Sequence, residues 1–479
     1  MVDSDDLIDL PPDQGQLDVV AVGAATIVRV KVERLFGLYT YELPQEPREF
    51  DRTPIIYGEN GLGKTSILRL LFHLLSPVGD RGHRTFMSQV KFGRIEVYLS
   101  NDVTVAAYRQ GDALLGAVRL EVKKFGDLLG AWSWFPKETP PWERAAAFQG
   151  AALPDVRATS QMVLSQKAYE EAVFDLMRRE ANPREGERAF LNALRENVPP
   201  IYILSADRVL SSDTMPRDLA QRGRPIEDMS EARGRALRDA VRLAARHLVR
   251  LGVQATRQGS MSVHTIYQDL MRRLLSSAAR GKGKKSPKIH TLIQTLRSLS
   301  APYEVYAKYG LAPELDAEKL IGLLDAGKPS ARASAAKVLA PYVESLTRQS
   351  KSIQYAYSVI DNLVSTTNTF LLDKRLEFSM VDGLVIKNKL DVVLRPTDLS
   401  SGEQQLYLLF CHVIVTHRSG GIFIIDEPEI SLNVRWQRRL VDALLRLDVQ
   451  KNLQFVFASH SIEILSKHRD SVVPLRENA

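Results

Sequence analysis

A glycine-rich segment near the start of the chain has the residue types and the spacing of a phosphate-binding loop. It reads GENGLGKTS and lies between an apolar run and a stretch with helical periodicity, a context that an accidental glycine turn does not explain. Glycines let backbone N–H groups turn toward phosphate oxygens, and the start of a helix favours negative charge. We expect Lys64 to contact the β- and γ-phosphates of a nucleotide and Thr65 to bind Mg²⁺. The residues expected at the nucleotide are Gly58, Asn60, Gly61, Gly63, Lys64, Thr65 and Ser66.

Two adjacent carboxylates follow a strand-length apolar run late in the chain, in the segment GGIFIIDEPEISL. A buried strand that ends in such a pair would present Asp426 to Mg²⁺, usually through water. Glu427 would then be the general base, or the polarising group, for an attacking water. Taken alone, the pair could equally be a polar strand end that begins a turn at Pro428. The phosphate-binding loop in the same chain favours the catalytic interpretation.

Two further segments could bind an anion. The run LSSGEQQLYLLF places Ser400, Ser401 and Gly402 directly before an apolar helix whose first N–H groups are free. Alone, this run is only a good helix cap, with Glu403 in the first turn. The run FVFASHS ends a strand beside His460, which could contact a γ-phosphate or be an ordinary surface histidine.

The segments that must position these residues have strand and helix patterns at both ends of the chain and helical patterns between them. We expect one or two strands over 25–43, a hairpin over 95–108, and helix–strand alternation over the last 80 residues. Helices are expected over 229–373, with breaks at 281–288 and near Pro302, Pro313 and Pro329. The expected organisation is a polar leader (1–24), the first part of an α/β head (25–110), a mixed helical insertion with a short strand at 201–204 (111–228), a basic helical arm and flexible loop (229–300), a helical segment (301–373) and the second part of the head (374–479).

These motifs together resemble the ABC-class ATPases, and in detail the branch that contains the OLD, RecF and chromosome-maintenance proteins. Walker A, the LSSGE signature, the IIDEPE Walker B with its ISLN D-loop, and the SH switch occur in the order of that class. The resemblance covers about residues 25–110 and 370–470. It implies an ABC-type ATPase head, a mixed sheet with a P-loop core, interrupted by a large and mainly helical insertion.

The resemblance also implies that two chains, or an even-numbered set, share their nucleotide sites. Ser400, Ser401 and Gly402 would close on the γ-phosphate held by a second head, Ser431 would lie at that interface, and His460 would sense the γ-phosphate. The Q-loop glutamine could be Gln89 or Gln110, and the adenine contact could be Phe36 or Tyr39. Asn433 stands where relatives often have histidine, and Ser401 and Glu403 replace the Gly and Gln of transporter signatures, which argues against a transporter.

The positive charge of the chain is concentrated in one segment. Residues 229–300 contain 15 Lys and Arg and 3 acidic residues, a net charge of +12, whereas the whole chain carries +7. Arg238, Arg242, Arg246 and Arg250 step by four beside an apolar seam of Leu237, Val241, Ala244, Leu248 and Leu251. A second run, Ile266, Leu270 and Leu274, could return against this seam, followed by a Gly/Lys-rich loop, 280–288. The arginines could bind nucleic acid, dock an acidic protein, or form a solvated helix face.

Composition and resemblance together set the expected cellular role. No run approaches the roughly 20 apolar residues of a membrane helix and the N-terminus is acidic, so we expect a soluble, cytoplasmic protein. The single cysteine, Cys411, is expected to be buried. The chain ends soon after His460, and we expect no C-terminal nuclease domain of the OLD kind. It thus resembles the ATPase subunits of two-gene bacterial phage-defence systems such as PARIS and Septu, which implies an ATP- and Mg²⁺-dependent homo-oligomer that holds or releases a separate effector. The alternative is a DNA repair or remodelling ATPase similar to RecF.

Overall fold

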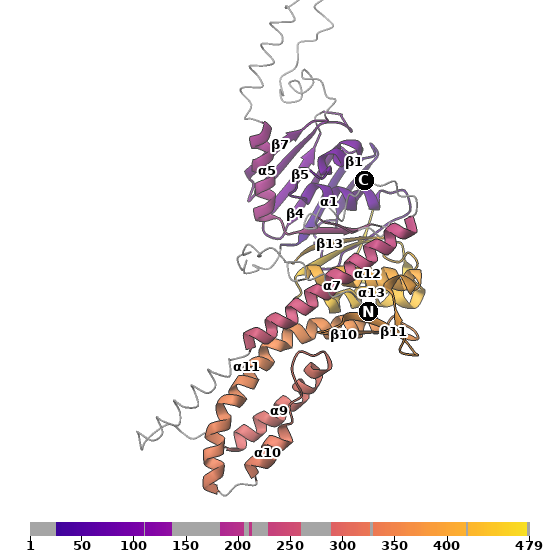
Figure 1. Cartoon of the computed structure of the whole chain (residues 1–479). Coiled ribbons are helices and arrows are strands. Elements are labelled where there is room, and N and C mark those ends of the chain that lie inside the picture. The colour runs from indigo at the N-terminus through magenta and orange to yellow at the C-terminus, as the bar shows by residue number, and fades with distance from the viewer. Residues whose placement is uncertain are drawn as a thin grey trace, which may run out of the picture.

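The structure is a computed structural model of the whole chain (Figure 1). It describes residues 25–109, 111–136, 183–205, 210–212, 229–259, 289–325, 329–417 and 420–476. The expected polar leader, Gln110, the returning run at 266–274 and the Gly/Lys-rich loop lie outside the described residues.

The N-terminal lobe is built on an antiparallel six-stranded sheet with the order β2-β1-β4-β5-β6-β7. Its strands are β1 (Ile27–Leu35), β2 (Tyr39–Leu43), β4 (Arg94–Leu99), β5 (Val103–Tyr108), β6 (Val118–Lys124) and β7 (Asp127–Trp134). Helix α5 (Pro183–Asn197) packs on β7, where a Cβ on Gly130 would lie 2.7 Å from the carbonyl oxygen of Ala189. Residues 111–136 were expected to begin the mixed helical insertion, 111–228. This was wrong, because β6 pairs with β5 and β7 with β6, so the hairpin extends the sheet of the head.

The second sheet is the one that positions the candidate site. It has the order β15-β3-β14-β13-β8-β9, and all its pairs are parallel except β8 with β9. The strands are β3 (Ile55–Tyr57), β8 (Ile201–Leu204), β9 (Leu210–Ser212), β13 (Gly421–Asp426), β14 (Leu453–Ala458) and β15 (Val472–Pro474). The strands β8, β13 and β14 are buried along their whole length, as expected of parallel strands covered on both faces. The carboxyl ends of β3, β14 and β13 therefore meet at one edge of the sheet.

Each face of the parallel sheet contributes to a different hydrophobic core. Ile422 and Ile424 face a core shared with α1 (Lys64–Leu75) and the N-terminal sheet. Phe423 and Ile425, the alternate residues of the same strand, face the core of the helical part. The two sheets are also joined by Gln454, whose side chain accepts from the backbone N–H of Ile27 (2.7 Å) and donates to its carbonyl oxygen (2.8 Å).

The remaining elements are mostly helices. They cover the face of the parallel sheet that carries Phe423 and Ile425, and they extend away from the head (Figure 1). The helices are α2 (His83–Gln89) in the N-terminal lobe, α7 (Met229–Gly259), α9 (Ile289–Lys308), α10 (Ala317–Asp325), α11 (Pro329–Asn368), α12 (Ser401–Thr416), α13 (Val434–Leu447) and α14 (Ile462–Lys467). The described residues also include a small sheet of β10 (Lys374–Ser379), β11 (Gly383–Asn388) and β12 (Val393–Leu394), and the 3-10 helices η1 (Pro396–Asp398) and η2 (Arg469–Ser471). The helix break expected near Pro302 is absent, because α9 runs through that residue.

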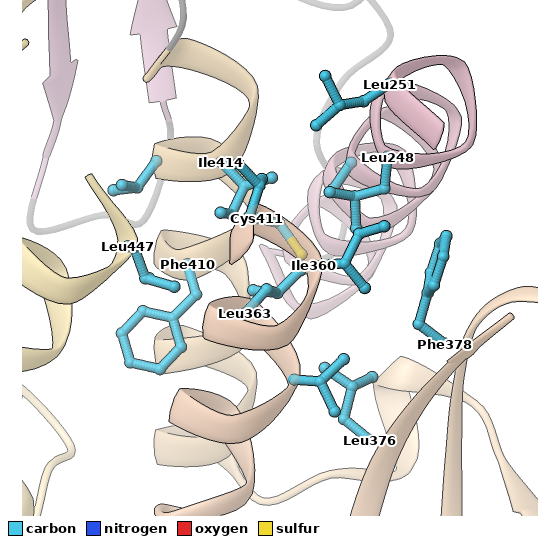
Figure 2. Close-up of a cluster of buried hydrophobic side chains, with 14 of the residues drawn as sticks. Leu248, Leu251, Ile360, Leu363, Leu376, Phe378, Phe410, Cys411, Ile414 and Leu447 are labelled. Carbon is cyan, nitrogen blue, oxygen red and sulfur yellow. The ribbon is translucent and has the colours of Figure 1, made fainter. Parts of the chain in front are cut away.

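Figure 2 shows where the helical part joins the head, with side chains from α7, α11, α12, α13 and β10 in one cluster. The apolar seam predicted on α7 is buried here and in the adjoining core, as the sequence analysis expected. Cys411 of α12 is also fully buried, and burial raises the pKa of its thiol. Among the described residues, no helix is both long and apolar enough to span a membrane.

Candidate active site

The glycine-rich loop connects β3 to α1, as its sequence predicts. Gly61 and Gly63 have φ angles of +91° and +93°, in the left-handed region that glycine adopts without strain. A Cβ on Gly63 would also lie 2.6 Å from Leu35 Cδ2. The buried ammonium of Lys64 donates to the carbonyl oxygens of Gly58 (2.8 Å) and Glu59 (3.2 Å). The lysine is therefore held inside the loop, with its charge beside the N-terminus of α1.

Aromatic side chains from the first two strands border this loop. Phe36 Cε2 lies 3.0 Å from the position that a Cβ on Gly63 would take. The hydroxyl of Tyr41 donates to the carbonyl oxygen of Leu62 (3.1 Å), and the ring of Tyr39 stacks on Tyr41 with centroids 5.8 Å apart. Of the two candidates for an adenine contact, Phe36 therefore adjoins the loop directly, whereas Tyr39 lies one ring further away.

The end of β13 meets the end of the glycine-rich loop. Thr65 Oγ1 donates to Asp426 Oδ1 over 3.2 Å, although the two residues are 361 positions apart. Asp426 is only 4 % exposed, and burial raises the pKa of its carboxyl, against the opposing effects of the Thr65 hydrogen bond and of Arg69 and Lys64. A buried carboxylate and a hydroxyl beside a phosphate-binding loop are the oxygen ligands that suit Mg²⁺. The residues present thus fit a magnesium–nucleotide complex.

Glu427 and His460, which the sequence analysis considered separately, lie in contact. His460 Nδ1 is 2.5 Å from Glu427 Oε2. Burial and the negative charge of Glu429 raise the pKa of Glu427, whereas His460 lowers it. Glu427 also has a φ of +51°, which is unusual for a residue with a side chain, and its N–H donates to the carbonyl oxygen of Ala458 (2.9 Å). The carboxylate is therefore fixed at the sheet edge by backbone and side chain together.

Glu429 is a site residue that the sequence analysis missed. Its buried Oε1 accepts three hydrogen bonds from the loop after β14: from Ser459 Oγ (2.7 Å), from the N–H of His460 (2.8 Å) and from the N–H of Ser461 (3.0 Å). One oxygen thus fixes the backbone that carries His460. The ligand atoms of Glu427, Glu429 and His460 lie within 4.8 Å of one another, which is close enough for one cation to contact all three. The available sequence signal was a second acidic residue two positions after Glu427.

The signature residues cap α12 at an exposed position. The side chain of Ser400 accepts from the N–H of Glu403 (3.4 Å), while Glu403 Oε2 accepts from the N–H and the hydroxyl of Ser400 (2.8 Å each). Glu403 Oε1 also accepts from Lys374 Nζ (2.9 Å). Burial opposes ionisation of Glu403, but Lys374 and Ser400 hold the pKa of its carboxyl below the usual value. Ser400 and Ser401 are exposed, so their polar groups are accessible from outside the chain.

The D-loop lies directly against the signature. A Cβ on Gly402 would be 2.6 Å from the carbonyl oxygen of Ser431 and 3.1 Å from Trp436 Cζ3, so only glycine fits. Gln437 of α13 then links this loop to the switch. Its side chain accepts from Ser461 Oγ (2.7 Å) and donates to the carbonyl oxygen of Leu432 (2.8 Å). Switch, D-loop and signature are therefore consecutive neighbours.

Of the two glutamine candidates for the Q-loop, Gln89 is among the described residues. Gln89 ends α2 and lines a cavity of about 810 Å³ together with Thr85, Ser88 and Trp134. None of the residues that line this cavity belongs to the glycine-rich loop or to the acidic end of β13. The catalytic assignment therefore rests on the contacts at the sheet edge and not on this cavity.

Comparison with known proteins agrees with the site as that of a nucleotide-binding ATPase. Residues 321–466, less than a third of the chain, match the family described as "AAA domain, putative AbiEii toxin, Type IV TA system". The matched range includes the signature, Asp426, Glu427 and His460, but not the glycine-rich loop. The match supports a nucleotide-binding ATPase of the AAA/ABC type.

Similar solved structures include two Smc head domains. The first, from Pyrococcus furiosus with an extended coiled coil and bound to the C-terminal domain of ScpA, is 12 % identical, with a TM-score of 0.37 and coverage of 95 % of this chain and 96 % of that chain. The second, from Pyrococcus yayanosii with a coiled coil and joint, is 13 % identical, with a TM-score of 0.36 and coverage of 95 % and 97 %. At these scores, neither bears on the function of this chain. No curated protein matches it.

Proposed function

We propose that this chain binds and hydrolyses ATP with Mg²⁺ at the edge of its parallel sheet. The observation that carries the proposal is the hydrogen bond of Thr65 to Asp426, because it joins the loop suited to phosphates to the carboxylate suited to the metal. Lys64, from inside the loop, would contact the β- and γ-phosphates. Thr65 and Asp426 would hold Mg²⁺, the latter usually through water.

The same residues suggest how water is activated. Glu427 lies one residue beyond Asp426, and burial together with the charge of Glu429 raises the pKa of its carboxyl and thus its basicity. His460 Nδ1 lies 2.5 Å from Glu427 Oε2. A protonated His460 would donate to the carboxylate, and a neutral His460 would accept from the carboxylic acid. Glu427 would take the proton of the attacking water, and His460 would orient toward the phosphate side of the site. Bound Mg²⁺ would neutralise charge on the phosphate oxygens.

We propose further that two chains share each nucleotide. Ser400 and Ser401 are exposed at the start of α12, and Gly402 lies against Ser431. A serine pair that caps a helix and faces outward is suited to bind the γ-phosphate held by a second copy. Such an interface would be isologous, so that each copy supplies its glycine-rich loop to one of the two sites and its signature to the other. Larger even-numbered assemblies follow the same rule.

The cellular role that we propose is regulation of a separate effector, a nuclease or toxin, in bacterial defence against phage. Support comes from the description of the matched family, which includes a putative toxin of a type IV toxin–antitoxin system. The long helical part, which extends from the head in Figure 1, offers surfaces through which the ATP state could be passed to such a partner. A second candidate, a DNA repair or remodelling ATPase similar to RecF, is favoured by the exposed arginines of α7.

The ATPase proposal is tested by Glu427→Gln, which removes the base and keeps the side-chain size. Turnover should fall by about 10²-fold or more, while Mg-ATP binding is retained. The matched control is Glu304→Gln, since Glu304 is exposed on α9, far in sequence from the motifs. Hydrolysis by Glu427→Gln at the wild-type rate would refute the assignment. The proposed effector is tested by co-purifying the chain with the product of the adjacent gene, with and without ATP. Absence of binding under both conditions would count against the proposed regulation of an effector.

A further inference from the structure

Five arginines form one row along α7, on the side opposite its buried seam. They are Arg235, Arg238, Arg242, Arg246 and Arg250, and all five are exposed. At 3.6 residues per turn, these positions fall within a sector of about 120°, and at 1.5 Å per residue the row is about 22 Å long. The opposite side carries Leu237, Val241, Ala244 and Leu248, all buried against α11 and α12. The helix therefore has one side committed to the core and one side free for contacts.

The row is not neutralised by the protein itself. In the part of the chain that the structure describes, none of the five arginines makes an ion pair, whereas the exposed Arg395 and Arg438 each pair with a carboxylate. Between Arg235 and Arg250, one acidic residue, the partly buried Asp239, falls in the same sector, so this stretch of the sector carries a net charge of about +4. A surface helix stabilised by its own charges would alternate signs at a spacing of three or four residues. The like charges of this row repel one another, and a bound anionic partner would relieve that repulsion.

We propose that the arginine row of α7 binds the phosphate backbone of duplex nucleic acid. Successive arginines at a spacing of four residues are about 6 Å apart along the helix axis, close to the axial rise of two nucleotides, about 6.8 Å. The helix contains no Phe, Trp or Tyr, so it offers no platform on which single-stranded bases would stack. Protein interfaces are centred on aromatic and apolar anchors, and the row lacks these as well. A regular array of phosphates is the anion that fits.

The helix that carries the row also contacts the part of the chain that carries the signature. Helix α7 packs against η1, which directly precedes the signature, and against α12. A Cβ on Gly234 would lie 3.4 Å from Thr397 Cγ2 and 3.5 Å from the guanidinium of Arg238. A duplex held by the first arginines would thus be only a few ångströms from η1. We expect duplex binding to change the rate of ATP turnover, a consequence that rests on the proposed ATPase function.

Binding is measured by fluorescence anisotropy of the full-length protein with a labelled 30-base-pair duplex DNA, over about 50 to 200 mM salt. Five phosphate contacts predict a slope of log K against log salt of about −4.5, which is a loss of affinity of about 500-fold over this range. The triple variant Arg238→Gln/Arg242→Gln/Arg246→Gln should have a slope of about −1.8 and lose only about 12-fold. Duplex RNA, single-stranded DNA and polyglutamate serve as the competing ligands.

Two further variants of the chain serve as controls. Arg188→Gln/Arg195→Gln/Arg438→Gln removes the same charge from exposed positions on α5 and α13 and should keep the wild-type slope. Replacing the three α7 arginines by lysine should restore the slope, because phosphates accept either cation. If the triple glutamine variant misfolds, as judged by its melting temperature, the single variant Arg242→Gln decides the question, with an expected slope of about −3.6 against an unchanged slope of about −4.5.

Three outcomes overturn the proposal. They are a wild-type slope shallower than about −2, an unchanged slope in the glutamine variant, and tighter binding of polyglutamate than of duplex, which would assign the row to an acidic protein. The two proposals fail separately. A protein that hydrolyses ATP but binds no duplex contradicts this inference alone, and one that binds duplex with the predicted slope but never hydrolyses ATP contradicts the ATPase alone.

Discussion

Glu429 should control turnover without controlling nucleotide binding. Its Oε1 accepts three hydrogen bonds from the loop that carries His460, and it contacts neither the glycine-rich loop nor the signature in any of those bonds. Hydrogen bonds to a charged group contribute about 1.5–3 kcal/mol each. Glu429→Ala, which removes all three, should therefore destabilise the switch loop by about 4–9 kcal/mol, comparable to the stability of a whole domain.

Glu429→Gln is the more informative change, because the amide keeps one acceptor oxygen and loses the charge. Neutral hydrogen bonds are about half as strong as charge-assisted ones, so we expect the loop to lose about 3 kcal/mol. With tenfold in rate per 1.4 kcal/mol, kcat should fall by about 100-fold. KM should change by less than about threefold, since no ground-state contact to the nucleotide is removed. Ser459→Ala, which removes one of the three bonds, should have an intermediate effect.

The assay is steady-state ATP hydrolysis by the wild type and the three variants, with ATP affinity and melting temperature measured on the same preparations. A purely structural role would lower the melting temperature and leave kcat of the folded fraction unchanged. A raised KM at unchanged kcat would place Glu429 in nucleotide binding. Wild-type kcat and KM together in Glu429→Gln would refute the positioning role outright.

Three other changes test separate parts of the site. Lys64→Ala should lose ATP affinity in calorimetry. Lys64→Ala and Ser401→Arg should each be inactive alone, but mixing the two proteins should restore some hydrolysis, because one shared site of a mixed pair contains neither defect. If a tagged pull-down shows mixed oligomers and no hydrolysis returns, the nucleotide sites are not shared. Gly402→Ala should slow turnover at unchanged ATP affinity, because its methyl group would lie 2.6 Å from the Ser431 carbonyl oxygen, and a wild-type rate would show that the D-loop moves freely. Burial lowers the pKa of His412 to about 4, so only the unfolded chain takes up this proton as the pH falls from about 7 to about 4. The wild type should then lose about 3 kcal/mol more unfolding free energy than His412→Leu in urea titrations, and equal losses would show that His412 does not titrate in this way.

The parts of the fold that were predicted correctly are those with a strong local signal. The run Ile422–Ile425 is apolar at every position, as a parallel strand covered on both faces must be, and it forms β13. The hairpin of β6 and β7 was missed, although Val118, Leu120 and Val122 alternate with polar residues, because its assignment depends on pairing with β5 at a distance in the chain. Local sequence does not report which strand edge is vacant.

The prediction of a helix break near Pro302 was wrong for a related reason. Proline removes one backbone hydrogen bond, but the tyrosines that follow it bind α11: the hydroxyl of Tyr303 donates to the carbonyl oxygen of Leu346 (3.1 Å), and that of Tyr306 to the carbonyl oxygen of Ser350 (3.3 Å). These contacts hold the turns directly after the proline against α11.

In the candidate site, too, the residues with a strong local sequence signal were predicted and those without one were missed. Lys64, Thr65 and Asp426 were predicted because each belongs to a contiguous motif whose mechanism fixes the residue type. Glu429 and Gln437 were not, because each acts by reaching a loop or strand end that is distant in sequence. No periodicity or spacing marks a carboxylate that accepts hydrogen bonds from a segment 30 residues later.

The place of β3 in the parallel sheet has a consequence for synthesis on the ribosome. Both of its neighbours, β14 and β15, come from the end of the chain, and the register pairs Ile55 with Phe457 and with Val472. At about 5–20 residues per second, the roughly 400 residues between them take about 20–80 s to make. Throughout that time the strand that carries the glycine-rich loop has two unpaired edges. The nascent chain therefore cannot use ATP as a folding ligand, and the last strands to emerge decide when the nucleotide site first exists.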